Sequence, residues 1–270
     1  MRVTDDKSRN LEVAEALVQR ASERGARLAV LPEMFLWRGP EEGIPAAAES
    51  LDGPSVARLG RLAARASVTL VAGSLYEADP SGGLPFNTTV VFGPDGDRLG
   101  VYRKIHLFDV SIPGKVAVRE SERMQAGDEV VCVDTPVGRV GLSVCYDLRF
   151  PELYRRLARE GAAIVCVPSA FTHATGAAHW EVLLRARAIE NQIYVIAPNQ
   201  VGPTTDGPPV WGGSSIIGPW GEVLARSPDA ETLIVAEIDP RQQNAVRQGL
   251  PCLEHARLTV GGEVVERAAE

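Results

Sequence analysis

The stretch VGLSVCYDLRFPEL, residues 140–153, decides the fold class because an apolar strand pattern passes directly into a helix pattern. Val140, Leu142 and Val144 are typical of a strand, and Pro151 stands where proline favours the first turn of a helix. In α/β proteins the carboxyl ends of such strands face the ligand crevice. The stretch therefore predicts an α/β fold and the edge of the sheet at which a site would lie.

Cys145 lies between this strand and this helix. A thiol at that place is close to backbone N–H groups and to the positive end of the helix dipole, and both favour a reactive thiolate. A buried core cysteine is the alternative for Cys145, and it is our interpretation of the other three cysteines, Cys132, Cys166 and Cys252.

Helix and strand patterns alternate on both sides of this stretch, which is the signature of an α/β sheet. Helices are expected at residues 8–24, 56–66, 151–159 and 179–192, and strands at 28–31, 68–75, 163–167, 194–197 and 233–238. Hairpins are expected at 86–101, 130–145 and 214–225. Residues 109–128 show no clear period and form a long segment, so we expect a functional loop there.

The composition excludes several classes of protein. The 270 residues are 45% hydrophobic and 23% charged with a net charge of −7, which is ordinary for a globular chain and has the wrong sign for neutralising nucleic-acid phosphates. We find no apolar run of membrane-spanning length, and the charged first ten residues are unlike a signal peptide. The four separated cysteines fit neither a disulfide scaffold nor a structural zinc site. We expect a cytoplasmic protein without a nucleic-acid or membrane partner.

Two further residues follow strand patterns. Glu33 ends LAVLPE, residues 28–33, where apolar flanks are expected to raise the carboxyl pKa toward that of a general base; a helix N-cap is the alternative. Lys104 lies in YRKIHLF, residues 102–108, among apolar and aromatic residues, and a surface lysine beside a hairpin is the alternative.

Taken together, five segments closely resemble the nitrilase, or carbon–nitrogen hydrolase, superfamily. They are LPEMF (31–35), YRKIHLFD (102–109), GLSVCYDLRFPEL (141–153), HWEVLLRARAIENQIYV (179–195) and PWGEVLA (219–225). The resemblance covers nearly the whole chain. It implies an αββα sandwich that becomes a four-layer αββα–αββα assembly on dimerisation, hence a homodimer or higher homo-oligomer, with no metal or organic cofactor.

The resemblance also implies a catalytic triad of Glu33, Lys104 and Cys145. A second glutamate of many members corresponds to Glu120, with Glu122 and Glu129 as neighbouring alternatives. Glu33 would take the thiol proton, and the sulfur would attack an amide carbon. The Lys104 ammonium and the backbone N–H of Tyr146 would stabilise the oxyanion. Ammonia leaves, and water then hydrolyses the thioester.

Within the superfamily, the chain looks most like the branch of omega-amidases and deaminated-glutathione amidases, whose substrates are small amides that carry a carboxylate. The residues that contact this carboxylate in the branch correspond to Arg149 and Thr175. For Arg149, an internal salt bridge to Asp147 or Glu152 is the alternative. Trp37 stands where some relatives have tyrosine, and we expect it, with Tyr146, among the substrate-binding residues.

Three alternatives to such an amidase remain open: an N-carbamoyl amino acid hydrolase, an aliphatic nitrilase, and a catalytically silent partner protein.

Residues 1–270 are expected to form a single carbon–nitrogen hydrolase domain. Relatives begin with a buried strand ahead of the segment that matches residues 5–11, and only residues 1–4 precede it here. We therefore expect the chain to lack the usual first strand.

Overall fold

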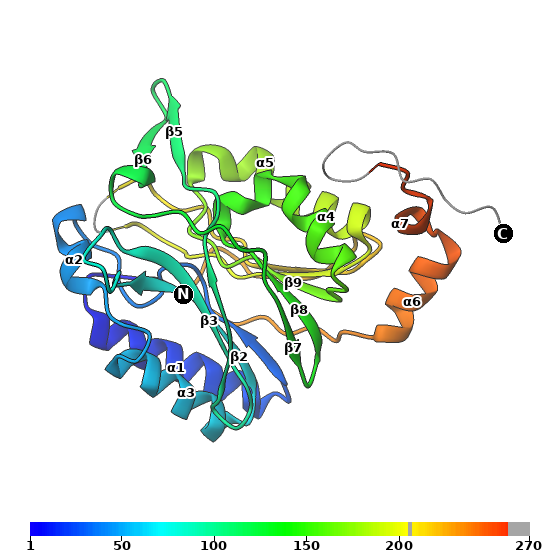
Figure 1. The fold of residues 1–270 in the computed structure, drawn as a ribbon, viewed down its shortest axis with the longest axis horizontal. Coiled ribbons are helices and arrows are strands. Elements are labelled where there is room, and N and C mark those ends of the chain that lie inside the picture. Colours follow the sequence, from blue (N-terminus) through cyan, green and yellow to red (C-terminus); the bar gives the residue numbers. More distant parts are fainter. Residues whose placement is uncertain (205–206, 259–270) are drawn as a thin grey trace.

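In the computed structural model, the described residues are 1–204 and 207–258, and they form an αββα sandwich (Figure 1). Helices α1 (Lys7–Glu23) and α3 (Pro54–Ala66) cover one sheet. Helices α4 (Pro151–Arg159) and α5 (His173–Asn191) cover the other. The αββα architecture expected from the sequence is confirmed, and all four layers come from one chain.

The first sheet has the strand order β1-β2-β3-β4, with β1 parallel to β2 and the other pairs antiparallel. Its strands are β1 (Leu28–Val30), β2 (Thr69–Glu77), β3 (Phe86–Phe92) and β4 (Arg98–Arg103). Residues 1–6 precede α1 without forming a strand.

The second sheet has the order β12-β11-β10-β9-β8-β7, with β8, β9 and β10 parallel to one another. Its strands are β7 (Cys132–Thr135), β8 (Gly138–Leu142), β9 (Ile164–Cys166), β10 (Tyr194–Ala197), β11 (Ser215–Ile217) and β12 (Val223–Arg226). Its central strands are parallel and buried, as α/β proteins require.

The remaining elements lie between these strands and helices or follow the last strand. They are η1 (Glu41–Gly43), α2 (Ile44–Ala47), β5 (Asp109–Ile112), β6 (Val116–Arg119), η2 (Glu120–Glu122), η3 (Cys145–Arg149), α6 (Pro240–Gly249) and α7 (Cys252–His255). Figure 1 shows the β5–β6 hairpin projecting beyond the sandwich and α6 and α7 at the far end of the molecule.

Helix α3 shows how the sequence produces the outer layers. Pro54 occupies the first turn, and the chain leaves the helix at Ser67 in the left-handed conformation. The apolar residues on its inner face recur at helical spacing and are buried in one core cluster: Val56, Leu59, Leu62, Ala63 and Ala66. Each buried leucine contributes about 1.5–3 kcal/mol, so packing against β2 and β3 rather than helix propensity holds α3 in place.

The space between the sheets is a second, continuous core. Val71 of β2, Val91 of β3 and Tyr102 of β4 belong to the same cluster as Val140 of β8 and Val165 of β9. The two sheets are therefore held face to face by apolar contacts, and this contact fixes the strand ends of one sheet relative to those of the other.

Two predicted segments differ in extent from the structure. Helix α5 begins at His173, six residues before the predicted start, because Gly176 lowers the helical signal. A Cβ at Gly176 would lie 2.2 Å from the Trp211 ring, so close packing accounts for this glycine. The expected functional loop at 109–128 instead contains the β5–β6 hairpin.

The predicted strand at residues 233–238 is wrong, because this segment joins no strand ladder. It lies across a cavity of about 600 Å³ whose lining includes residues 27–32 on one side and 232–238 on the other. A strand requires a partner backbone at hydrogen-bonding distance. Among the described residues, no backbone pairs with residues 233–238, so the strand-like pattern does not become a strand.

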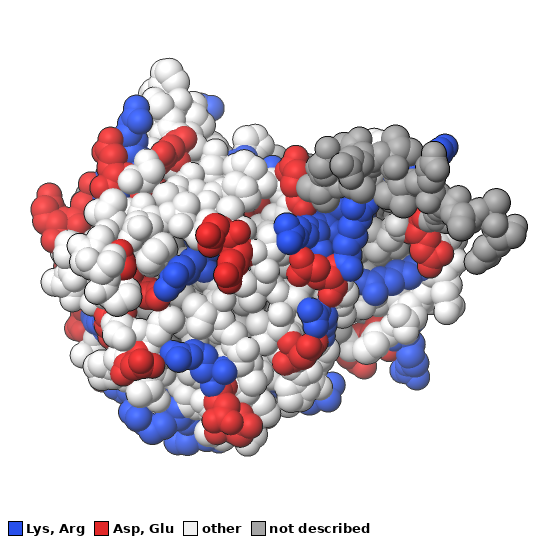
Figure 2. All heavy atoms as spheres, viewed as in Figure 1, with Lys and Arg blue, Asp and Glu red and all other residues white. Residues whose placement is uncertain are grey.

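Charged side chains of both signs are interspersed on the face shown in Figure 2. The net charge of the whole chain is −7. None of the described helices is long and apolar enough to cross a membrane. The four cysteines are free thiols. Within residues 1–204 and 207–258, no group of three or more His, Cys, Asp and Glu side chains is placed to hold a metal ion.

Candidate active site

The ends of strands from both sheets meet at one cavity of about 190 Å³. Glu33 lies three residues after β1, Lys104 directly follows β4, and Cys145 lies three residues after β8. All three line the cavity, together with Glu120 of η2. Residues up to 112 positions apart in sequence (Glu33 to Cys145) are thus brought together at the carboxyl ends of strands, where α/β folds place their sites.

Backbone contacts hold each side chain at this edge. The Lys104 N–H donates to the Asn87 carbonyl over 2.9 Å, which extends the β3–β4 pairing by one step. The Cys145 N–H donates to the Pro168 carbonyl, also over 2.9 Å, and ties the nucleophile segment to the end of β9. Gly73 of β2 lets the chain before Glu33 approach closely, because a Cβ there would lie 2.0 Å from the Pro32 carbonyl oxygen.

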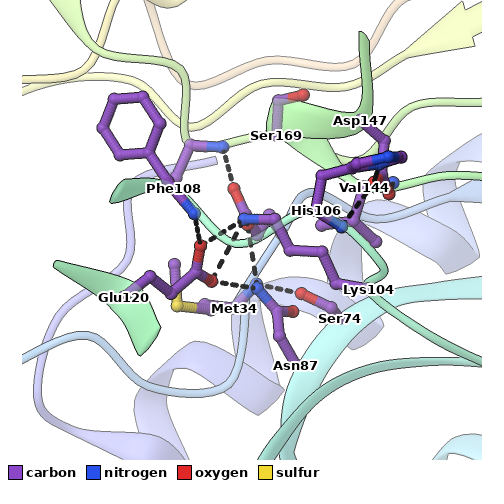
Figure 3. Close-up of polar contacts among 12 residues, drawn as sticks. Met34, Ser74, Asn87, Lys104, His106, Phe108, Glu120, Val144, Asp147 and Ser169 are labelled. Carbon is purple, nitrogen blue, oxygen red and sulfur yellow. Dashed lines mark hydrogen bonds and ion pairs between the residues drawn. The ribbon is translucent and has the colours of Figure 1, made fainter. Parts of the chain in front are cut away.

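Two carboxylates share one ammonium at the centre of the site (Figure 3). Lys104 Nζ lies 3.1 Å from Glu33 Oε1 and 2.8 Å from Glu120 Oε2. Asn87 Nδ2 donates to the same two carboxylates, over 2.9 Å and 3.2 Å. Backbone N–H groups complete the cluster, from Ala170 to Glu33 over 2.7 Å and from Phe108 to Glu120 over 2.6 Å. The arrangement holds both glutamates rigidly in a buried pocket.

The Cys145 thiol and the Glu33 carboxylate line the same cavity, close enough that each shifts the pKa of the other. Cys145 has a φ of +47°, and Met34, directly after Glu33, has a φ of +46°. Few residues other than glycine adopt such angles, and strained backbone of this kind concentrates at functional sites. The two left-handed residues turn the chain sharply directly after Glu33 and at Cys145 itself.

Burial and the neighbouring charges set the protonation states. Burial raises the pKa of Cys145 well above its ordinary value, and the Glu33 charge adds to this effect. Burial also opposes the charged form of Glu33, but Lys104, the Cys145 thiol and the Ala170 N–H together hold its pKa below 4.5. Burial disfavours the charge on Lys104 as well, yet Glu120 and Glu33 raise its pKa well above 10.5. The resting site therefore contains a neutral thiol, an ionised base and an ammonium.

Two expectations from the sequence are corrected by this arrangement. The position of Cys145 ahead of a helix was expected to favour a thiolate, but burial beside a carboxylate keeps the thiol protonated. The apolar flanks of Glu33 were expected to raise its pKa, but its ion pair with Lys104 outweighs the burial.

Asp147, two residues after the nucleophile, supports the turn that carries it. Its buried carboxylate accepts from Tyr102 Oη over 2.7 Å and from the Val144 N–H over 2.8 Å. It also accepts from the His106 N–H over 3.1 Å, and His106 Nδ1 lies 2.7 Å from it (Figure 3). The Lys104 strand and the Cys145 turn are thus joined through one carboxylate.

Three of the four predicted substrate-binding residues, Tyr146, Arg149 and Thr175, line the cavity. The Arg149 guanidinium lies over the Phe171 ring, 5.0 Å from its centroid, and 3.2 Å from His179 Nδ1. None of the ion pairs among the described residues joins Arg149 to Asp147 or Glu152, so the alternative salt bridge is absent there.

Trp37 is not among the residues that line the cavity. Its ring packs edge-on against Tyr76 with 6.0 Å between centroids, and Tyr76 is the residue that reaches the cavity. A Cβ at Gly39 or at Gly43 would lie 2.7 Å from the Trp37 ring. Trp37 therefore fills the space behind the wall, which sequence position alone did not distinguish from a place in the pocket.

The sequence did not single out Asn87, Ala170, Arg38 or Tyr76 as parts of the site. Asn87 is fully buried at the start of β3, and its strand pattern carries no sign of the two carboxylates that it binds. Ala170 acts through its backbone N–H, which any residue type supplies. Arg38 and Tyr76 line the cavity from segments that look like ordinary loop and strand.

The family model described as carbon–nitrogen hydrolase matches residues 1–248. An omega-amidase of Bos taurus is 40% identical over 257 residues, which are 95% of this chain and 92% of that protein. The C. elegans NitFhit protein has a TM-score of 0.88 and 38% identity, and the match spans all of this chain but 66% of that chain. Nit3 of Saccharomyces cerevisiae, a member of the nitrilase superfamily, has a TM-score of 0.84 at 33% identity, covering 93% and 91% of the two chains.

Proposed function

The chain belongs to the carbon–nitrogen hydrolase family, and on that premise we propose that it is a cysteine-dependent amidase that hydrolyses a small, carboxylate-bearing amide of the omega-amidase type. The observation that carries the proposal is that Cys145 lines one cavity with a buried Glu33, whose carboxylate lies 3.1 Å from Lys104 Nζ. A thiol needs an adjacent base of this kind to become a nucleophile.

Catalysis begins when the amide carbonyl carbon reaches Cys145. The thiol proton passes to Glu33, and the sulfur forms a bond to the carbonyl carbon. The carbonyl oxygen becomes an oxyanion, which the Lys104 ammonium and the backbone N–H of Tyr146 stabilise. One such preorganised donor typically contributes a factor of about 10² to 10³ in rate. Because Lys104 is already held by two carboxylates, it does not have to reorganise during the step.

The tetrahedral intermediate collapses by breaking its C–N bond. Glu33 returns the proton to the departing nitrogen, ammonia leaves, and the acyl group remains on Cys145 as a thioester. A water molecule then loses a proton to Glu33 and attacks the thioester carbon, which releases the carboxylic acid and restores the thiol. Glu120 keeps Lys104 in position and adds negative charge beside Glu33.

The Arg149 guanidinium supports recognition of a carboxylate. It lines the cavity, and no carboxylate of the described residues is paired with it. A guanidinium presents several donors in a planar fork that matches a carboxylate. Thr175 lies on the same wall, with its hydroxyl 3.1 Å from that of Thr172.

A substrate panel tests this proposal against the alternatives. Ammonia release is measured with alpha-ketoglutaramate, deaminated glutathione, an N-carbamoyl amino acid and a simple aliphatic nitrile; for deaminated glutathione, whose leaving group is an amine, release of the dipeptide is followed instead. Faster turnover of the carboxylate-bearing amides supports the proposal. A preference for the carbamoyl compound or the nitrile selects one of the other hydrolases, and no turnover of any compound favours a silent partner protein.

The pH dependence of kcat/KM follows from Glu33, which must be ionised to accept the thiol proton. Because its pKa is held below 4.5, the acid limb of the profile is expected below pH 4.5, and activity should not fall between pH 7 and pH 5.5. Circular dichroism at each pH separates unfolding from titration. An acid limb centred between pH 6 and 7 in folded protein would contradict the assignment of an ionised resting base.

We also propose a homodimer or higher homo-oligomer, formed through what we call the α5–turn surface. It comprises the exposed Val182 and Ile189 of α5 and the exposed Trp220 and Val223 at the β11–β12 turn. Arg185 Nε donates to the Gly221 carbonyl, which joins helix and turn into one surface. Exposed apolar surface of this kind is typical of association sites.

Val182→Glu is expected to shift the assembly toward monomer, because it places a charge within the α5–turn surface. Light scattering after size-exclusion chromatography measures the mass. Leu99→Glu, an exposed apolar residue of β4 outside that surface, serves as the control and should not change the mass. A monomeric parent protein, or equal masses for all three proteins at an oligomeric value, contradicts the proposed surface.

A single domain and a cytoplasmic location are further parts of the proposal. The shared core between the two sheets supports one domain across the described residues, while residues 205–206 and 259–270 lie outside them. The free thiols support a reducing compartment. Subcellular fractionation of the native organism tests the location.

A further inference from the structure

A second arginine, Arg38, lines the same cavity as Cys145 and Arg149. It lies five residues after Glu33, in the segment between β1 and η1, whereas Arg149 ends η3 on the other half of the sandwich. The two guanidinium groups therefore enter the cavity from different parts of the fold. The mechanism proposed above uses only one of them.

The hydrogen bonds of Arg38 leave most of its donors available. Its Nη1 donates to Gln200 Oε1 over 3.2 Å, and Gln200 Nε2 donates in turn to the Glu33 carbonyl over 2.7 Å. A guanidinium has five N–H donors, and this contact takes one. Gln200 is 1% exposed and held at both ends, so it fixes the guanidinium beside the catalytic base.

No ion pair among the described residues joins Arg38 to a carboxylate, although other arginines near the site have one. Arg123, which also lines the cavity, is paired with Glu41, and Arg103 is paired with Glu77. Burial lowers the pKa of Arg38, while the negative charge of Glu33 acts in the opposite direction from within the site. A cation removed from water without an anionic partner is costly to a protein.

Among the residues that the structure describes, the cavity is thus lined by two arginines that form no ion pair with a carboxylate, beside Cys145. A single carboxylate on the substrate accounts for one of them. We propose that Arg38 is a specificity-determining residue that binds a second acidic group, so that the preferred substrates are small amides bearing two acidic groups. This inference rests on the proposed amidase function and narrows its substrate class.

Three amides test the inference. Glutaramate has one carboxylate, the monoamide of tricarballylate has two on its acyl part, and N-glutarylglycine has one on the acyl part and one on the leaving group. In the parent protein, kcat/KM for one of the two diacids is expected to exceed that for glutaramate by about 10- to 100-fold, the range for a hydrogen-bonded charge pair. The diacid that is preferred shows on which side of the scissile bond Arg38 acts.

Arg38→Gln should abolish this preference by raising KM for the preferred diacid, with kcat and all glutaramate constants within about threefold of the parent values. Arg38→Lys should retain part of the preference, because it keeps the charge without the fork. Arg98→Gln removes an arginine of β4 that pairs with Asp52 outside the cavity, and it should leave the preference unchanged. Melting temperatures of the variants verify folding.

Equal kcat/KM for all three amides in the parent protein would overturn the inference while leaving the amidase proposal standing. A fall in kcat for every substrate of Arg38→Gln would also overturn it and would indicate a structural role. If no amide is hydrolysed, the amidase proposal fails, and calorimetry on Cys145→Ser still tests Arg38. Either tricarballylate or unhydrolysed N-glutarylglycine should then bind at least tenfold more tightly than glutarate, and equal binding of all three compounds would reject the second acidic group.

Discussion

Cys145→Ala is expected to lower kcat for amide hydrolysis by about 10⁴- to 10⁶-fold, the scale on which removal of a catalytic nucleophile acts in other hydrolases. The reason is that, among the described residues, Cys145 supplies the only thiol in the lining of the cavity. Ammonia release under saturating substrate measures kcat. Mass spectrometry of the quenched parent enzyme should show the acyl adduct on the peptide that contains Cys145.

Cys132→Ala is the matched control for this prediction. Cys132 is also a free thiol, but it lies on β7, is partly exposed, and is remote from the cavity lining. Its replacement should leave kcat within about twofold of the parent value. Equal turnover by the parent protein and Cys145→Ala would refute the cysteine mechanism, whatever the activity of the control.

Lys104→Met is expected to destabilise the protein by about 3–5 kcal/mol and to reduce kcat by a factor of at least about 10². The stability falls because Glu33 and Glu120 are both buried and would lose the cation that they share. The rate falls because the oxyanion loses a donor. Urea denaturation measures the free energy of unfolding, and ammonia release measures kcat.

Two further variants separate stability from catalysis at Lys104. Lys104→Met combined with Glu120→Gln removes one of the two buried negative charges, so it should recover part of the stability without recovering the rate. Lys115→Met replaces an exposed lysine at the β5–β6 turn and should change neither quantity. A stable, fully active Lys104→Met protein would be incompatible with the charge cluster described above.

The pH dependence of stability follows from the same cluster. Folding lowers the pKa of Glu33 below 4.5, so Glu33 stabilises the folded protein fully above pH 4.5. This stabilisation is lost as the pH falls through the lower pKa that Glu33 has in the folded protein. Folding raises the pKa of Lys104 above 10.5, so Lys104 stabilises the folded protein fully below pH 10.5. This stabilisation is lost only as the pH rises through the higher pKa that Lys104 has in the folded protein. The stability difference between the parent and Lys104→Met should therefore be largest between these limits.

Local patterns were sufficient for most of the secondary structure, and they marked Glu33, Lys104 and Cys145 as candidates that the family resemblance then joined into a proposed triad. Amphipathic spacing located α1, α3 and α4 within two residues at each end, because the faces that they bury are set by sequence period alone. Glu33, Lys104 and Cys145 stood out because each follows a strand pattern, and the structure brings all three to one cavity. Only the resemblance of the chain to the family identified Glu120, rather than Glu122, as the second glutamate of the predicted site.

Other features depended on contacts that no local pattern records. The segment at 233–238 has a strand-like composition but no neighbouring backbone to pair with, and Trp37 is kept out of the cavity by its packing against Tyr76. Arg149 and Arg38 are ordinary arginines in the sequence. They differ from Arg123 only because Arg123 has a carboxylate beside it in the folded chain.

The sequence by itself determined that this chain alternates helices and strands. It also determined that Glu33, Lys104 and Cys145 each follow one of those strands. Only the tertiary structure decided their protonation states and partners. The interaction energy of charged groups depends on the distance between them and on their burial. Glu33, Lys104, Glu120 and Cys145 come close together and become buried only when the two sheets pack against each other. The cluster in which Glu33 and Glu120 share Lys104 beside the Cys145 thiol is therefore a property of the fold, because these residues are far apart along the chain.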